Sequence, residues 1–169
     1  MSVKYRDGRP GDGAMLSKLF CEAFAATFGH LYAEEDLAAF LCQKEEAAFE
    51  AELADPDFAF RLAEEDNVLA GYAKIGPNDL PGEAPDDTLE LHHLYVLPGW
   101  HGTGVGAALM DWVLDEARRR GAGHLQLSVF VDNHRARRFY ERYGFEEVGK
   151  YVFMVGNHED DDRVMRRAL

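Results

Sequence analysis

The sequence predicts an α/β domain built on one mixed, mostly antiparallel sheet of about six to seven strands, flanked by about four helices. Three observations predict this class. Short runs typical of strands recur along the chain, helical patterns separate several of them, and a glycine-rich turn joins a strand to a helix near the middle. At 169 residues and 19.0 kDa the chain has the size of one domain, and we expect residues 1–169 to form it.

The first half of the chain predicts a short strand, a long helix, a pair of shorter helices and a hairpin. Asp12 is the candidate N-cap of the long helix, because a short side-chain oxygen can accept a hydrogen bond from the first helical amides. The hairpin strands are separated by a polar turn, and a loop rich in Pro, Gly and Asp follows them. The expected ranges are 3–6, 12–28, 34–40, 45–53, 58–64 and 68–75, with the loop over 76–87.

The second half predicts the central strand, two helices and three further strands. In the central strand, alternation places Leu89, Leu91, His93, Tyr95 and Leu97 on one face, with Glu90, His92, Leu94 and Val96 on the other. The acidic run 159–162 reads as a solvated turn between the last two strands, which could also attract a cation. The expected ranges are 89–97, a helix over 104–120, a strand over 124–131, a helix after Asn133, and strands over 148–155 and 164–169.

Composition excludes several classes of function. A net charge of −13 and a pI near 4.9 speak against a nucleic acid partner. No apolar run approaches the ~18 residues that a membrane span needs, and the first residues do not read as a signal peptide. Cys21 and Cys42 fall within helical patterns and are expected to be reduced core residues. These features predict a cytoplasmic protein, and a homodimer is left open.

Arginine is unevenly distributed for so acidic a chain. Seven of the eighteen basic residues are arginines between Arg118 and Arg142. Such a cluster beside a glycine turn suits a polyanionic cofactor, although two solvated helix faces would give the same pattern.

The glycine turn itself predicts a site for a phosphate group. Gly102, Gly104 and Gly106 leave the start of the following helix without side chains, so backbone N–H groups can close on an anion. A Walker loop would need Lys and Ser or Thr after the last glycine, where the chain has Ala107 and Ala108. The G-x-G-x-G spacing also differs from the G-x-G-x-x-G of dinucleotide-binding proteins.

The pattern resembles the coenzyme A turn of the GNAT N-acetyltransferases, Gln/Arg-x-x-Gly-x-Gly/Ala. It is matched over 101–106, after the typical Leu-Tyr-Val-Leu-Pro of 94–98, with His101 where the family usually has Gln or Arg. A second family pattern, N-x-x-A-x-x-F/Y-Y-x-x-x-G-F, is matched over 133–145 in the expected order. The resemblance extends over essentially the whole chain and implies a GNAT fold with the cofactor cleft at its central strands. It implies that acetyl-CoA contacts Leu94, Tyr95, Val96, His101, Gly102, Thr103, Gly104, Val105, Gly106, Ala107, Asn133, Ala136 and Tyr140.

The resemblance also implies catalytic roles. Tyr140 takes the family position of the acid that protonates the departing thiolate. Glu90 and His92 lie about 7 Å apart on one strand face, and either could remove a proton from the acceptor amine, directly or through water. The alternative is that both only pair with neighbours in the sheet. His93 is expected on the opposite face, in a structural role.

We therefore expect an acetyl-CoA-dependent N-acetyltransferase that acts on a primary amine by direct attack in a ternary complex. Within the family, the stretches 23–30 and 152–156 resemble the spermidine/spermine acetyltransferases of PaiA type, and a polyamine or other cationic small molecule suits the negative charge. A protein or peptide N-terminal acetyltransferase and a non-catalytic acyl-CoA-binding module are the alternatives. The histidines lack metal-ligand spacing and the acidic run lacks an EF-hand pattern, so no metal is expected.

Overall fold

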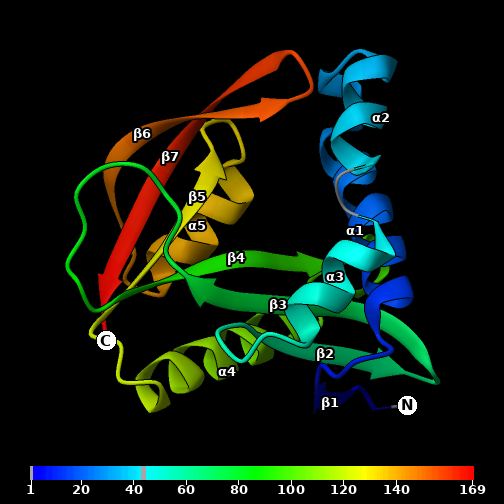
Figure 1. The fold of residues 1–169 in the computed structure, drawn as a ribbon, viewed down its shortest axis with the longest axis horizontal. Helices are drawn as coiled ribbons and strands as arrows, with labels where there is room; N and C mark the ends of the chain where they lie inside the picture. The colour runs from blue at the N-terminus through cyan, green and yellow to red at the C-terminus, as the bar shows by residue number, and fades with distance from the viewer. Residues whose placement is uncertain (1, 43–44) are drawn as a thin grey trace.

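The computed structural model describes residues 2–42 and 45–169 and contains one seven-stranded sheet, shown in Figure 1. The strand order is β1-β2-β3-β4-β5-β7-β6; all neighbours are antiparallel except β4 and β5, which run parallel. The predicted mixed, mostly antiparallel sheet is confirmed. The strands are β1 Lys4–Asp7, β2 Ala59–Glu65, β3 Val68–Pro77, β4 Thr88–Val96, β5 His124–Phe130, β6 Glu146–Val155 and β7 His158–Ala168.

Helices cover both faces of the sheet. The apolar side of α4 packs against β3, β4 and β5, while α1 to α3 cover the other face of β2 and β3. Each face therefore has its own core, one around Leu109 and Val113 and the other around Phe20 and Phe49. The helices are α1 Gly13–Phe28, α2 Glu34–Cys42, α3 Glu46–Leu53, α4 Val105–Arg119 and α5 His134–Arg142, with short 3-10 helices η1 Gly29–Leu31 and η2 Pro98–Trp100.

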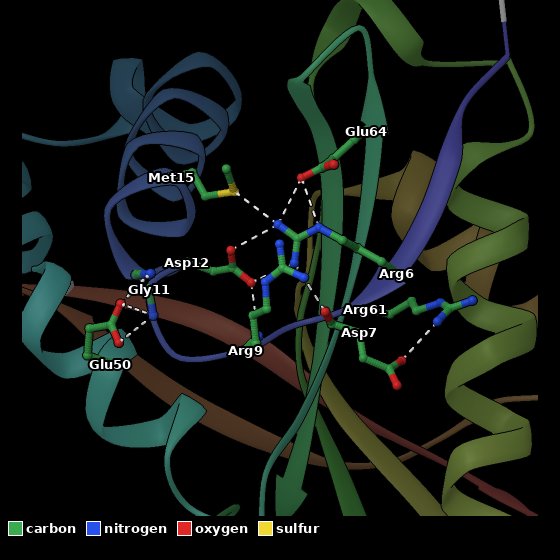
Figure 2. A network of polar contacts seen from close by, with 10 residues as sticks. Arg6, Asp7, Arg9, Gly11, Asp12, Met15, Glu50, Arg61 and Glu64 are labelled. Carbon is green, nitrogen blue, oxygen red and sulfur yellow. Dashed lines mark hydrogen bonds and ion pairs between the residues drawn. The ribbon is translucent and has the colours of Figure 1, made fainter.

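The start of α1 differs from its prediction. Asp12 is the N-cap residue, but its side chain makes no capping bond and instead holds both terminal nitrogens of Arg6, at 2.7 and 2.9 Å. The capping acceptor is the carboxylate of Glu50 on α3, 2.8 Å from the amide of Gly13 and 3.0 Å from that of Gly11 (Figure 2). A distant acid replaces the local cap because Arg6 binds Asp12 bidentately.

The central strand contains a bulge that the alternation pattern does not reveal. Lys74 of β3 pairs with His93, whereas the next residue, Ile75, pairs with Leu91, so His92 is an extra residue on β4. An extra residue shifts every later side chain to the opposite face of the sheet.

The predicted faces of the central strand are therefore wrong beyond the bulge. Leu91 lies in the core under α4, whereas the rings of His93 and Tyr95 lie 5.1 and 5.2 Å from that of Phe20 in the other core. His93 thus shares the face of Glu90, and its Nδ1 lies 2.9 Å from the hydroxyl of Tyr72.

The sequence predicts a solvated turn for the acidic run 159–162. In the structure this run is part of a strand. β7 begins at His158 rather than at 164, so the turn shortens to Gly156 and Asn157. The long hairpin of β6 and β7 reaches the far ends of α1 and α2 (Figure 1), where the amide of Asn157 donates to Asp36 at 3.0 Å. Pairing along β6 draws the acidic residues into the sheet despite their low strand propensity.

Cys21 is a free thiol and is half-buried rather than a core residue. The side chain of Cys42 lies outside the described part of the chain, so its prediction stays untested.

Candidate active site

The parallel strands β4 and β5 diverge at the centre of the sheet. Their pairing ends at Glu90 and Gln126, although both strands continue well beyond. Directly after β4, the amide of Leu97 donates to Ala70 of β3. Successive amides of a strand point in opposite directions, so the N–H and C=O of Val96 point away from β3 and toward β5. The end of β4 therefore directs backbone polar groups between the diverging strands.

The glycine turn connects this strand end to α4. Gly102 and Gly104 have φ values of 76° and 92°, in the region that favours glycine, and a Cβ at either would meet nothing within 4 Å. The turn is therefore open on its outer side. The first amides of α4, from Val105 onward, have no acceptor within their own helix, so the open turn can present them to an anion.

His101 links this turn to α5. Its Nε2 lies 2.8 Å from the carbonyl oxygen of Val96, and its Nδ1 is in close contact with the Arg135 guanidinium. Arginine only donates, so Nδ1 accepts and the ring hydrogen on Nε2 is donated to Val96. The family's usual Gln or Arg is thus replaced by a side chain that binds β4 and an α5 arginine together.

Helix α5 carries the second group of predicted site residues. Asn133 is its N-cap, and its Oδ1 accepts from the amide of Ala136 at 3.3 Å. Tyr140 lies further along, with its ring 5.9 Å from that of Phe145. Burial raises the pKa of Tyr140 to about 12, so the phenol keeps its proton at neutral pH. Burial also raises the pKa of Tyr95 on β4, and the nearby Tyr140 adds to that shift.

Glu90 and His92 lie together beside the bulge. Glu90 Oε2 is 3.3 Å from His92 Nδ1, and the amide of Asp79 donates to Glu90 Oε1 at 2.9 Å. Burial raises the pKa of Glu90 to about 7, while burial and the charge of Lys74 lower the pKa of His92. A carboxyl with this pKa can accept or release a proton near neutral pH, as a general base must.

The comparisons with known proteins agree with this geometry. Residues 16–145 match the model of the acetyltransferase (GNAT) family. An uncharacterized N-acetyltransferase of Mycobacterium tuberculosis is 37% identical over 159 residues, covering 94% of this chain and 98% of the relative. The chain belongs to the GNAT family of acetyltransferases. This membership confirms the enzyme class and the acetyl-CoA co-substrate that the resemblance implied.

Two solved structures show the same GNAT fold. The PaiA N-acetyltransferase of Thermoplasma acidophilum, in complex with coenzyme A, aligns with a TM-score of 0.80 at 20% identity over 100% of both chains. The ribosomal-protein-S18-alanine N-acetyltransferase of Escherichia coli aligns with a TM-score of 0.71 at 19% identity, over 99% of this chain and 94% of that one. At these identities the likeness concerns the fold alone.

The arginine cluster divides between the two ends of the GNAT site. Arg119 and Arg120 bind Glu116 at the C-terminal end of α4, away from the glycine turn at its start. Of the two alternatives that the sequence left open, these α4 arginines therefore fit a helix face away from the phosphate turn. Arg135 lies beside the turn, where it contacts His101, and the sequence motif alone did not distinguish it from the other arginines.

The sequence also gave no role to two carboxylates of β7. Asp160 and Asp162 are buried on one face of that strand. The available sequence signal was that Asp160 and Asp162 are two residues apart, which places their side chains on one face of a strand. Among residues 2–42 and 45–169, no cluster of three or more metal-ligating side chains is found, and none of the helices described is long and apolar enough to span a membrane.

Proposed function

We propose that this GNAT protein, as one domain over residues 1–169, acetylates a primary amine of a cationic small molecule such as a polyamine. The acceptor attacks directly within a ternary complex. The buried Glu90–His92 pair beside the diverging strands carries the proposal, because a non-catalytic acyl-CoA-binding module has no need of a carboxyl whose pKa is about 7. A cytoplasmic location belongs to the same proposal.

The residues of the turn fit the coenzyme. The open space at Gly102 and Gly104 leaves room for a pyrophosphate against the amides from Gly102 to Ala107. The outward N–H of Val96, together with Leu94 on the same strand edge, suits the amide-containing arm. Acetyl-CoA supplies the acetyl thioester when bound. Asn133, as cap of α5, orients that helix toward the same space.

The acceptor must lose a proton before it can attack. An aliphatic amine has a pKa near 10, so it arrives as an ammonium ion at neutral pH. The Glu90–His92 pair takes that proton, directly or through water, and leaves a lone pair on nitrogen. The bond to nitrogen forms as the bond to sulfur breaks, and the N–H of Val96 stabilises the charge on the carbonyl oxygen.

Tyr140 provides the proton for the leaving group. Its hydroxyl is neutral at the working pH, as a phenol with a pKa of about 10 or above is, so it can donate to the thiolate as that group departs; burial raises its pKa to about 12. Proton donation of this kind contributes ~10²–10⁴-fold to the rate.

Two observations favour a cationic acceptor. The chain's net charge favours a cation, and the resemblance of 23–30 and 152–156 to the spermidine/spermine acetyltransferases of PaiA type supports the same class. The second candidate is a peptide N-terminus, which the name of the Escherichia coli neighbour favours.

A panel assay of free CoA release tests the proposal. The panel holds a polyamine, a monoamine and a peptide with a free N-terminal alanine. We expect the highest kcat/KM with the polyamine. Preference for the peptide would replace the acceptor class, and no release with any amine would refute the enzymatic function.

A further inference from the structure

The acidic run of β7 has one buried and one exposed face. Asp160 and Asp162 point into the protein, and Asp162 is only 6% exposed. The side chain of Asp161, between them, is 59% exposed and binds Arg163. Two adjacent aspartates of one strand thus have opposite surroundings.

Asp160 is fully engaged, whereas Asp162 is not. The hydroxyl of Tyr32 donates to Asp160 in a short contact, and His158 Nε2 lies 3.4 Å from the other oxygen. Within residues 2–42 and 45–169, no hydrogen bond or ion pair reaches the Asp162 carboxylate, since Arg163 donates only to its backbone oxygen. A buried carboxylate without a partner is costly to the folded protein, which points to a ligand that completes it.

Aromatic side chains surround this carboxylate. Asp162 pairs in register with Tyr151 of β6 and Phe130 of β5. Burial first, and then the charge of Asp162, raises the pKa of Tyr151. Burial and Asp160 raise the pKa of Tyr32, and the charge of Asp162 adds to that shift. Aromatic faces around a carboxylate form a suitable site for an ammonium ion, which gains from both.

Tyr151 also connects Asp162 with the base. Glu90 adds to the rise in the Tyr151 pKa, so the two carboxylates act on one phenol. Glu90 is level with Gln126 on β5 and Asp162 is level with Phe130. Those four residues correspond to roughly 13 Å along the strand, and because β5 lies between β4 and β7 the two acids are also about 10 Å apart across the sheet. Two buried acids this far apart match an acceptor with two distant positive charges, because a single ammonium group that reacts beside Glu90 cannot also reach the Asp162 carboxylate.

We propose that Asp162 binds the second, unreacted ammonium group of a long diamine or polyamine acceptor, while the Glu90–His92 pair receives the proton of the reacting amine. The inference rests on the proposed amine acetylation and names its substrate class. Asp162 determines specificity in this arrangement and takes no part in the proton transfer.

The test compares two ligands and two variants. The ligands are diaminooctane, with an amine at each end, and octylamine, which lacks the second ammonium. The variants are Asp162→Asn and the matched control Asp161→Asn, which makes the same charge change on the exposed face. Calorimetry measures the binding of each ligand to the protein saturated with coenzyme A, so that the result does not depend on turnover.

We expect the wild type to bind diaminooctane at least about tenfold more tightly than octylamine, about 1.4 kcal/mol. Asp162→Asn should abolish that preference, whereas Asp161→Asn should keep it. Equal affinity of the wild type for both ligands, or an unchanged preference in Asp162→Asn, would overturn the proposal. Tight binding of diaminooctane that depends on Asp162, without CoA release in a turnover assay, would support the diamine site and refute the proposed acetylation.

Discussion

Oε2 of Glu90 lies 3.3 Å from Nδ1 of His92, while Nε2 of the same ring lies 2.8 Å from the carbonyl oxygen of Pro77. The carbonyl can only accept, so Nε2 carries a hydrogen and Nδ1 faces the carboxyl. One proton between Glu90 and Nδ1 then satisfies both groups. A proton taken from the acceptor amine can therefore pass between the two residues.

This pairing predicts the pH dependence of the reaction. The base must be deprotonated, so kcat/KM should fall as the pH drops below about 7, the pKa to which burial raises Glu90. Glu90→Gln should lower the rate and move this acidic limb to lower pH, because burial lowers the pKa of the remaining His92. The measurement is the pH–rate profile of the wild type and of the variant.

The matched variant is His92→Gln, which leaves the carboxyl in place. Its pH–rate profile should keep an acidic limb set by the pKa of Glu90. Each single loss is expected to be partial and the double loss severe. Full activity of the Glu90→Gln, His92→Gln protein at neutral pH would place the base elsewhere.

Sequence alone could predict the order of the elements and the glycine turn, because both depend on local patterns. It could not predict which residues share a face of β4. The extra residue at His92 is defined by pairing with β3, and alternation carries no signal of it. Glu90 and His92 were still found together, because His92 is the extra residue itself and the faces reverse only after it.

The second prediction concerns the stability effect of Asp162. Burial and the neighbouring Asp160 and Asp161 raise the folded-state pKa of Asp162 to about 7, against an ordinary value near 4. The folded state therefore holds this proton more tightly than the unfolded state, and stability is lost as the pH rises from about 4 to about 7. Asp162→Asn should raise the Tm over wild type, and the gain should be larger at about pH 8 than at about pH 5.

Thermal unfolding of both proteins across that range measures the gain. Asp161→Asn is the control and should give no such increase, because Arg163 lowers the pKa of Asp161. A Tm gain for Asp162→Asn that is absent, or equal at both pH values, would contradict the assignment of a buried, unpartnered carboxylate.

The strand β7 shows a second limit of sequence analysis. Four consecutive acids favour a turn by propensity, and the strand forms there because β6 pairs with all four, while β5 pairs only with the last, Asp162. The burial of alternate acids is a property of the sheet. The same holds for Glu50, which caps α1 from α3 and has no local sequence signal.

The third prediction concerns the phosphate turn. Gly104→Val should weaken coenzyme A binding by well over tenfold, more than ~1.4 kcal/mol, because the side chain would enter the open space and strain a positive φ. Gly121→Val is the matched control: Gly121 follows the other end of α4, has φ 82° and also has nothing within 4 Å. If calorimetry showed the same loss of coenzyme A affinity in both folded variants, backbone strain alone, and not lost space for the pyrophosphate, would explain the loss.

The fourth prediction concerns a contact that stabilises the fold and lies outside the candidate active site. Glu50→Ala removes the acceptor of the Gly11 and Gly13 amides and should lower the free energy of unfolding by about 1–2 kcal/mol. Glu46→Ala removes an exposed acid of the same helix and should cost only a fraction of that. Chemical denaturation measures both values, and equal losses would argue against the capping role. Coenzyme A affinity should be unchanged in either variant.

The most direct test of acetyl transfer compares the wild type with Tyr140→Phe, measuring CoA release and N-acetylated amine together at saturating amine. If acetyl transfer is the reaction, we expect the wild type to form one acetylated product for each CoA released. In Tyr140→Phe, kcat should be at least about tenfold lower with coenzyme A affinity nearly intact, because only the proton donor is lost. A wild type that binds acetyl-CoA but forms no acetylated amine, or a Tyr140→Phe enzyme as fast as wild type, would contradict this account.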